Sequence, residues 1–161
     1  MRHGIAYDPE NPDYEDDRMR PLTPKGREKV NAIAHALKKL DVKPDRILSS
    51  LYVRSEQTAA IVAKILNRKD KLEYSDFLVP TGHADDIIGE IVEKHMVDEL
   101  LIISHEPCIS LLVSTLAAGN LDLAVAIKNG GVCSLAADDL RIERRATLEW
   151  LLTPKISLKI K

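Results

Sequence analysis

Short apolar runs alternate along this chain with longer segments in which apolar residues recur every three or four positions. The short runs are typical of strands that are buried on both faces, and the longer segments are typical of helices with one buried face. The clearest strand is "ELLIIS" at residues 99–104, because its apolar run is too short for a helix. The alternation predicts an α/β fold, a three-layer α/β/α sandwich in which helices cover both faces of a mostly parallel sheet with an antiparallel strand.

The first expected helix follows an acidic loop. Residues 8–17, "DPENPDYEDD", contain two prolines and many carboxylates, which indicates a solvated loop. Thr23 then suits an N-cap, and Pro24 suits the first helical position because its missing N–H costs no hydrogen bond there. We expect the buried face of this helix to consist of Val30, Ile33, Ala34, Leu37 and Leu40.

The alternation of strand and helix continues to the last forty residues. Further strands are expected at 45–50 and 71–76, and further helices over 55–66, 84–96 and 107–118. The C-terminal segments "GGVCSLAAD" and "RATLEWLLT" are then typical of two strands joined by a polar turn. We therefore expect the chain to close with an antiparallel addition to the parallel sheet.

The composition excludes several classes of protein. A chain of 161 residues has the size of one domain, and we expect residues 1–161 to form a single one. A formal net charge of -2 argues against nucleic acid or an anionic membrane as the main partner. The sequence has no apolar stretch long enough for a membrane span and no apolar signal-peptide core, so we expect a cytoplasmic protein. Cys108 and Cys133 form no CxxC pair, and we expect both to be reduced and buried.

Basic residues follow the predicted strands. In an open parallel sheet, ligands bind beyond the carboxyl ends of the strands. His105 comes directly after "ELLIIS", and Arg54 comes shortly after "RILSS" at the start of a helix. Arg20 precedes the first helix. Arg2 and His3 would complete this set if a strand preceded them.

Five short motifs occur in order along the chain: the RHG triplet at Arg2 to Gly4, "RPLTPKG", "SSLYVRSEQTA", "VPTG" and "IISHEP". This ordered set resembles the histidine phosphatase superfamily, also called the phosphoglycerate mutase-like fold, and it spans most of the chain. The short length and the "RPLT" element are most similar to the SixA-type phosphohistidine phosphatases. The RHG triplet alone recurs by chance, whereas the ordered set is specific.

The chemistry of phosphoryl transfer suits these residues. The reaction requires an in-line nucleophile and positive charge around the phosphoryl oxygens. A neutral imidazole can attack phosphorus, and the resemblance implies this role for His3, through a phosphohistidine intermediate. Arg2, Arg20 and Arg54 carry planar guanidinium groups that bind phosphate in a bidentate manner. Their positive charge also favours the neutral form of His3.

His105 and Gly4 complete the predicted phosphate site. The resemblance implies that His105 is a further donor to the phosphoryl oxygens, and Gly4 would let the chain turn sharply beside the anion. Structural alternatives exist, since a single histidine after a strand is often structural, and Arg20 beside an acidic loop is typical of an exposed ion pair. The ordered motifs favour the functional interpretation.

The other histidines are expected to be non-catalytic. His35 and His95 lie within predicted amphipathic helices, and neither these nor His83 has a partner at metal-ligand spacing. His105 and Glu106 lack the second histidine of an H-E-x-x-H helix. We therefore expect no metal and no cofactor.

The first departure from the family pattern lies at the beginning. Members usually have several apolar residues before RHG, which form a central strand, whereas only Met1 stands there in this sequence. We expect that part of the first strand is missing. Either the strand continues upstream of Met1, or residues 1–6 alone must place His3.

The second departure concerns a general acid. Members that act on phosphate esters carry a carboxylate that protonates the leaving oxygen, but "LVPTGHADD" has no acid before Gly82. Asp85 and Asp86 are nearby candidates, although acids there suit the start of a helix. An imidazole leaving group needs less proton assistance than an alkoxide, so the missing acid favours P–N cleavage.

These arguments predict a phosphohistidine phosphatase that acts on a histidine-phosphorylated protein of the phosphorelay or phosphotransfer type. The short chain lacks long insertions that would cover a small substrate, which leaves room for a protein surface. One alternative is a small-molecule phosphomonoesterase of the same superfamily, which would act on a phosphate ester. Another is a phosphate-binding regulatory module without catalytic activity.

Overall fold

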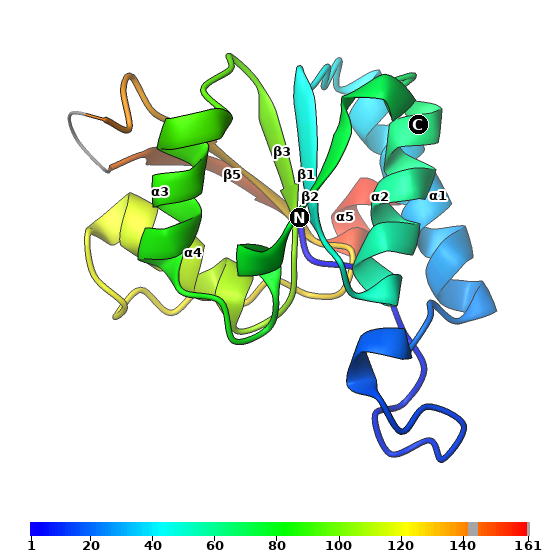
Figure 1. Ribbon diagram of the computed structural model, residues 1–161. Helices are drawn as coiled ribbons and strands as arrows, with labels where there is room; N and C mark the ends of the chain where they lie inside the picture. Colours follow the sequence, from blue (N-terminus) through cyan, green and yellow to red (C-terminus); the bar gives the residue numbers. More distant parts are fainter. Residues whose placement is uncertain (142–144, 161) are drawn as a thin grey trace.

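Three parallel strands form the central sheet of the computed structural model, which describes residues 1–141 and 145–160 (Figure 1). Their order across the sheet is β2 (Leu72–Ser75), β1 (Arg46–Ser50) and β3 (Leu100–Ile103). Leu48 of β1 faces Glu73 of β2 and Ile102 of β3. Parallel pairing brings the carboxyl ends of the three strands to one edge of the sheet, as the alternating pattern predicted.

Helices cover both faces of this sheet. The first pair, α1 (Pro24–Lys39) and α2 (Val53–Ile65), packs on one side, and α3 (Ala84–Lys94) and α4 (Cys108–Ala118) pack on the other (Figure 1). Each pair contributes to its own apolar cluster, the first around Ile33 and Val62 and the second around Ile88 and Leu112. The predicted three-layer α/β/α class is therefore confirmed.

Helix α1 begins as its sequence predicts. The Thr23 hydroxyl accepts a hydrogen bond from the Gly26 N–H at 2.9 Å, and Pro24 occupies the first turn. The expected buried face is confirmed for all its members except Leu40, which is 45% exposed. Leu40 is the C-cap, and Asp41 after it adopts a left-handed φ of 60°. The chain thus leaves the helical path at Leu40, and the periodicity no longer decides where that side chain lies.

The two C-terminal strands, β4 (Val132–Ala136) and β5 (Thr147–Leu152), pair antiparallel in a two-stranded sheet of their own. Residues 1–3 lie between this sheet and β3. The Arg2 N–H donates to the Gly131 carbonyl at 3.0 Å, and the His3 N–H donates to the Ser104 carbonyl at 3.0 Å. The antiparallel pair therefore joins the parallel sheet through the N-terminal residues and not through direct strand pairing. A short helix that the sequence patterns did not predict, α5 (Pro154–Ser157), follows β5.

Short 3-10 turns occupy the remaining connections, namely η1 (Asp17–Met19), η2 (Lys69–Lys71) and η3 (Asp76–Leu78). The acidic segment 8–17 is a loop of turns, as expected. Cys108 is buried and Cys133 is half-buried, and both thiols are free. None of the helices within the described ranges is long and apolar enough to cross a membrane.

Candidate active site

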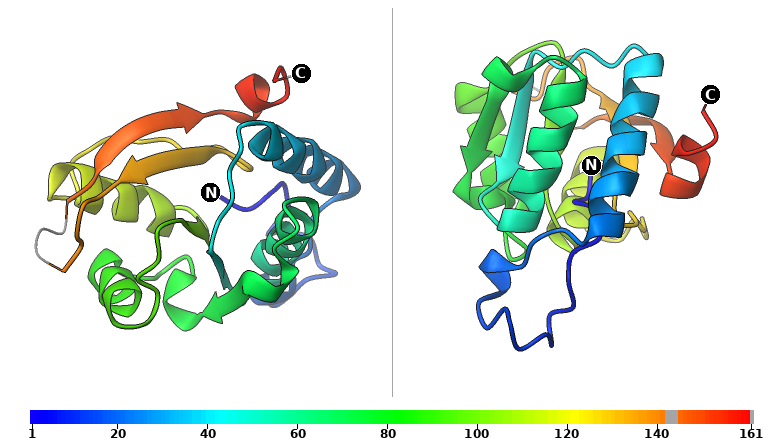
Figure 2. Two further views of the ribbon diagram at one scale, coloured as in Figure 1. Left: turned by 90° about the horizontal axis from the view of Figure 1, so that it is seen from above. Right: turned by 90° about the vertical axis from the view of Figure 1, so that its right-hand side faces the viewer.

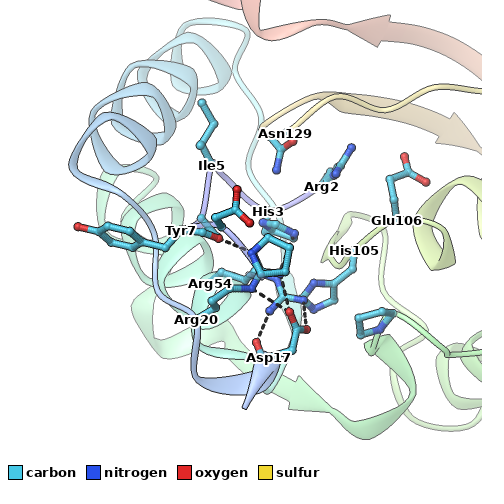
Figure 3. Close-up of a pocket in the computed structure, with 14 residues that line it drawn as sticks. Arg2, His3, Ile5, Tyr7, Asp17, Arg20, Arg54, His105, Glu106 and Asn129 are labelled. Carbon is cyan, nitrogen blue, oxygen red and sulfur yellow. Dashed lines mark hydrogen bonds and ion pairs between the residues drawn. The ribbon is translucent and has the colours of Figure 1, made fainter. Parts of the chain in front are cut away.

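A pocket of about 540 Å³ lies beyond the carboxyl ends of β1 and β3 (Figure 3). All five of the predicted basic residues line it, although they come from four separate segments of the chain. His3 and Arg2 come from the N-terminal segment, Arg20 from the end of the acidic loop, Arg54 from the first turn of α2, and His105 from the end of β3. The tertiary fold thus brings together the complete set of predicted basic side chains.

Hydrogen bonds define the tautomer of His3. Its Nδ1 lies 2.6 Å from the Gly4 carbonyl, which can only accept, so Nδ1 carries the proton. The Arg54 Nε–H in turn donates to His3 Nε2 at 3.3 Å. Nε2 is therefore unprotonated, and its lone pair accepts the hydrogen bond from Arg54.

The fold holds His3 in its neutral form. Burial is the main cause that lowers the pKa of His3 to about 3, although the hydrogen bond to Gly4 acts in the opposite direction. The positive charges of Arg54, Arg2 and Arg20 lower this pKa further. At neutral pH the imidazole is uncharged, as a nucleophile requires.

His105 lies beside His3, with their ring centroids 4.9 Å apart. Its Nε2 shares a hydrogen bond of 2.9 Å with the Ser50 hydroxyl at the end of β1. Burial, followed by the neighbouring His3 and Arg54, lowers the pKa of His105 to about 2. Its Nδ1 is buried and has no hydrogen-bond partner among residues 1–141 and 145–160. His105 thus lies in the pocket next to His3, with one ring nitrogen paired and the other unpaired.

Asp17 is a pocket residue that the sequence analysis missed. Its Oδ2 accepts a hydrogen bond from Arg54 Nη2 at 2.8 Å, and its Oδ1 accepts from Arg20 Nε and Nη2 at 2.8 and 2.6 Å (Figure 3). The carboxylate thereby takes guanidinium donors of two arginines, where a phosphate would also bind. The acidic loop suggested a solvated carboxylate, and the position of Asp17 three residues before Arg20 of "RPLT" was the available signal for a role in the pocket.

Replacement of Asp17 by asparagine is expected to tighten the binding of inorganic phosphate about fivefold, because the Asp17 carboxylate is half exposed and an ion pair open to solvent contributes about 1 kcal/mol. The variant removes the negative charge that competes for Arg20 and Arg54, and titration calorimetry measures the change in affinity. Asp16→Asn is the matched control, since Asp16 pairs with Arg18 outside the pocket. Weaker phosphate binding in Asp17→Asn would show instead that Asp17 is needed to position the arginines.

Gly4 has a different role from the one expected. It does not line the pocket, and it is absent from the glycines with positive φ, so no left-handed turn occurs there. A Cβ at this position would lie 2.5 Å from Val30 Cγ2 of α1. The Gly4 N–H also donates to the Thr58 hydroxyl of α2 at 3.0 Å. The missing side chain thus allows the segment after His3 to pack closely against α1 and α2.

The acidic candidates named from the sequence lie elsewhere. Asp85 and Asp86 occupy the first turn of α3 and do not line the pocket. Glu106 does line it, but its carboxylate accepts hydrogen bonds from the Ile127 N–H at 3.2 Å and from the Ser110 hydroxyl. Glu106 therefore connects the start of α4 to the segment before β4.

The remaining histidines also lie outside the pocket. His35 is exposed on α1, and His83 is the N-cap residue of α3. His95 caps the C-terminal end of α3 and was expected within it; its buried ring lies 3.7 Å from Glu73 and 4.0 Å from Glu90. Across the part of the chain that the structure describes, no group of three His, Cys, Asp or Glu side chains is placed to hold a metal ion.

Acidification is expected to destabilise the fold through the two pocket histidines. In the unfolded chain both take up a proton near pH 6.5, whereas the folded pKa values of His3 and His105 are about 3 and about 2. Between these limits the unfolded state binds more protons, so stability falls as the pH falls below 6.5. The decrease in melting temperature from pH 7 to pH 5 should be about 4 °C smaller in His105→Gln than in the wild type. Identical decreases would contradict the assignment of a neutral His105.

Comparisons with known proteins agree with this geometry. The model of the histidine phosphatase superfamily (branch 1) matches residues 1–78. The chain is 29% identical over 156 residues to phosphohistidine phosphatase SixA of Escherichia coli (strain K12). This match covers 96% of this chain and 91% of that protein.

The fold of this chain is also similar to those of solved structures. A structure of the protein histidine phosphatase SixA complexed with tungstate matches 96% of this chain and 95% of its own, with 29% identity and a TM-score of 0.83. The alpha-ribazole phosphatase from Shigella flexneri matches 96% of this chain and 95% of its own with a TM-score of 0.72, and its 17% identity indicates a shared fold only.

Proposed function

We propose that this chain is a phosphohistidine phosphatase of the histidine phosphatase superfamily, which acts on a histidine-phosphorylated protein. The observation that carries the proposal is the state of His3. Its ring is buried, neutral and protonated on Nδ1, and its Nε2 lone pair is directed at a cluster of arginines. A nucleophile in this state matches the first step of phosphoryl transfer to an enzyme histidine.

The proposed reaction has two steps. His3 Nε2 attacks the phosphorus, the bond between phosphorus and the substrate imidazole breaks, and the leaving nitrogen takes a proton from water. Water then attacks the phosphorus on His3, the proton that it gives up neutralises the hydroxide left by the first step, and inorganic phosphate leaves as the imidazole is restored. These steps require no metal ion or cofactor.

The arginines and His105 are proposed to bind the phosphoryl oxygens during both steps. Arg54 donates to His3 Nε2 and to Asp17 before substrate arrives, so its N–H groups must move to the phosphoryl oxygens as Asp17 is displaced. Arg2 contributes a buried Nε that has no hydrogen-bond partner within the described ranges of the chain. His105 contributes its ring nitrogen beside His3.

The acid–base properties of the pocket support cleavage of a P–N bond. Burial alone would raise the pKa of Asp17, but hydrogen bonds from Arg20 and Arg54 lower it below its usual value. A carboxyl group with a lowered pKa is deprotonated at neutral pH and cannot supply a proton to an alkoxide. An imidazole leaves with much less assistance, which favours phosphohistidine over a phosphate ester.

A competition between substrate classes tests the proposal. A phosphohistidine peptide, p-nitrophenyl phosphate and a set of sugar phosphates are incubated separately with the protein, and kcat/KM is measured for each. We expect the phosphohistidine peptide to be hydrolysed at least tenfold more efficiently than any ester. A preference for one sugar phosphate would favour the small-molecule phosphomonoesterase, and phosphate binding without any turnover would favour a regulatory module.

We further propose that residues 1–161 form a single domain and that the protein acts in the cytoplasm. Two free cysteines are consistent with a reducing compartment. The expected partner is a phosphotransfer or phosphorelay protein that presents its phosphohistidine at the pocket.

A further inference from the structure

A tight turn at residues 128–131 directly precedes β4. The Gly131 N–H donates to the Lys128 carbonyl at 2.6 Å, and Gly130 at the third position has a left-handed φ of 82°, which favours glycine. Asn129 occupies the second position, and its half-buried side chain lines the phosphate pocket (Figure 3). The proposed two-step reaction gives this side chain no role.

The backbone of this turn binds the N-terminal segment that carries His3. The Gly130 N–H donates to the Arg2 and His3 carbonyls, at 3.1 and 3.0 Å. In the opposite direction, the Arg2 N–H donates to the Gly131 carbonyl at 3.0 Å. Figure 2 shows the N-terminal segment between the β4–β5 pair and the parallel strands. These hydrogen bonds fix the position of the turn relative to residues 2–3.

The Asn129 side chain reaches the carbonyl that sets the proton position of His3. Its Nδ2 donates to the Gly4 carbonyl at 3.3 Å, and the same oxygen accepts the His3 Nδ1–H at 2.6 Å. A carbonyl oxygen has two lone pairs, so it accepts both bonds at once. Asn129 thus connects the turn before β4 to the predicted nucleophile through one shared oxygen.

The Gly4 carbonyl depends on these bonds for its orientation. Glycine restricts its own backbone less than any other residue does. The Gly4 N–H is held by the Thr58 hydroxyl, but the carbonyl belongs to the next peptide plane. Among residues 1–141 and 145–160, the side chains of His3 and Asn129 supply the only hydrogen bonds to this oxygen. Asn129 is therefore the group that holds the carbonyl toward His3 independently of His3 itself.

We propose that Asn129 is a positioning residue for the nucleophile: it keeps the Gly4 carbonyl directed at His3 Nδ1 and thereby keeps Nε2 unprotonated. Without this bond the carbonyl is free to turn away, and the ring proton is free to move to Nε2. A proton on Nε2 removes the lone pair that attacks phosphorus. The effect on rate rests on the proposed function, whereas the tautomer of His3 is a property of the protein without substrate.

Two substitutions of Asn129 test this proposal in the full chain. Asn129→Ala removes the donor, and alanine fits the turn because Asn129 does not have a positive φ. Asn129→Gln keeps an amide donor on a longer side chain. Asn120→Ala is the matched control, since it removes the same amide from an exposed residue outside the pocket.

Four quantities are measured for each protein. Nitrogen-15 NMR of the His3 imidazole reports which ring nitrogen is protonated and how fast the Nδ1 proton exchanges with water. Single-turnover assays with saturating phosphohistidine peptide report the rate of the chemical step. Titration calorimetry reports the affinity for inorganic phosphate, and thermal unfolding reports stability.

We expect Asn129→Ala to exchange the Nδ1 proton at least tenfold faster than the wild type. Its single-turnover rate should be about fivefold lower, the usual effect of the loss of one hydrogen bond between neutral groups. Its affinity for phosphate should stay within twofold, because Asn129 is not proposed to contact the phosphoryl oxygens. Asn129→Gln should retain at least half of the wild-type rate, and Asn120→Ala should match the wild type.

Each other outcome has a defined meaning. Unchanged proton exchange and an unchanged rate in Asn129→Ala would overturn the proposal. Parallel losses of rate and phosphate affinity would assign Asn129 to substrate binding instead, and equal losses of rate and melting temperature in both Asn129 variants would make it a structural residue of the turn. Faster proton exchange in Asn129→Ala, together with a wild type that does not hydrolyse phosphohistidine, would exclude the proposed function and leave the positioning role intact.

Discussion

His3→Ala is expected to abolish both turnover and formation of the phosphoenzyme while the fold remains intact. The variant removes Nε2, the unprotonated nitrogen that lies among the arginines, and alanine offers no other nucleophile. The His3 side chain belongs to neither apolar cluster, so its loss leaves the clusters of both helix layers unchanged. Single-turnover assays with a radiolabelled phosphohistidine peptide measure the loss.

The stability of the radiolabelled enzyme in acid and alkali tests whether the phosphoryl group is bonded to a histidine nitrogen. In the wild type the label should survive alkali and be lost in acid, as expected for a phosphorus–nitrogen bond. His35→Ala is the matched control, because His35 is an exposed histidine of α1 outside the pocket. A His3→Ala protein with a normal melting temperature and a near-normal single-turnover rate would exclude His3 as the nucleophile.

Arg54→Ala is expected to lower kcat/KM by about 10² to 10³, the usual effect of the loss of one preorganised charge stabiliser. Arg54 is 3% exposed, and its three donor nitrogens already lie within hydrogen-bond distance of His3 and Asp17. The substitution therefore removes the planar guanidinium group that is proposed to bind the phosphoryl oxygens. It also removes the N–H that donates to His3 Nε2.

Arg54→Lys tests the planar geometry of the guanidinium group separately from its charge. Lysine keeps the positive charge but offers a single ammonium group, so we expect it to restore less than a tenth of the wild-type rate. Arg141→Ala provides the control, since Arg141 forms an exposed ion pair with Asp139 outside the pocket. Full activity in Arg54→Lys would exclude bidentate binding by Arg54.

The local elements of this fold were predictable because each depends on residues that are neighbours in the sequence. Thr23 and Pro24 set the start of α1, and Gly119 ends α4 in the left-handed conformation that favours glycine. The run Leu100–Ile103 forms a strand because a short, wholly apolar segment is typical of a buried strand in a parallel sheet. The boundaries of the other helices and strands agree to within a few residues for the same reason.

The set of basic residues in the pocket was also predictable, through topology. His105 and Arg54 follow strands that are parallel neighbours, and parallel strands end at the same edge of a sheet. Ordered motifs then added Arg2, His3 and Arg20. Their catalytic and phosphate-binding roles remain predictions, for which the variants above are the tests.

Three features were decided by the tertiary structure alone. Asp17 meets Arg54 across 37 positions of the chain, and no local pattern encodes where the acidic loop closes. The tautomer of His3 depends on the Gly4 carbonyl and on Arg54 together. A cleft beside Met1 exists because β4 and β5 pair with each other and are hydrogen-bonded toward the parallel sheet through residues 1–3.

The features that the sequence determines and those that the tertiary structure decides differ in the range of the interactions on which they depend. Helix caps, strand periodicity and the order of the motifs depend on backbone conformation over a few residues, so the amino-acid sequence by itself determines them. Ion pairs, proton positions and unpaired strand edges depend on which distant groups share one buried volume. Only the packing of the complete chain decides that.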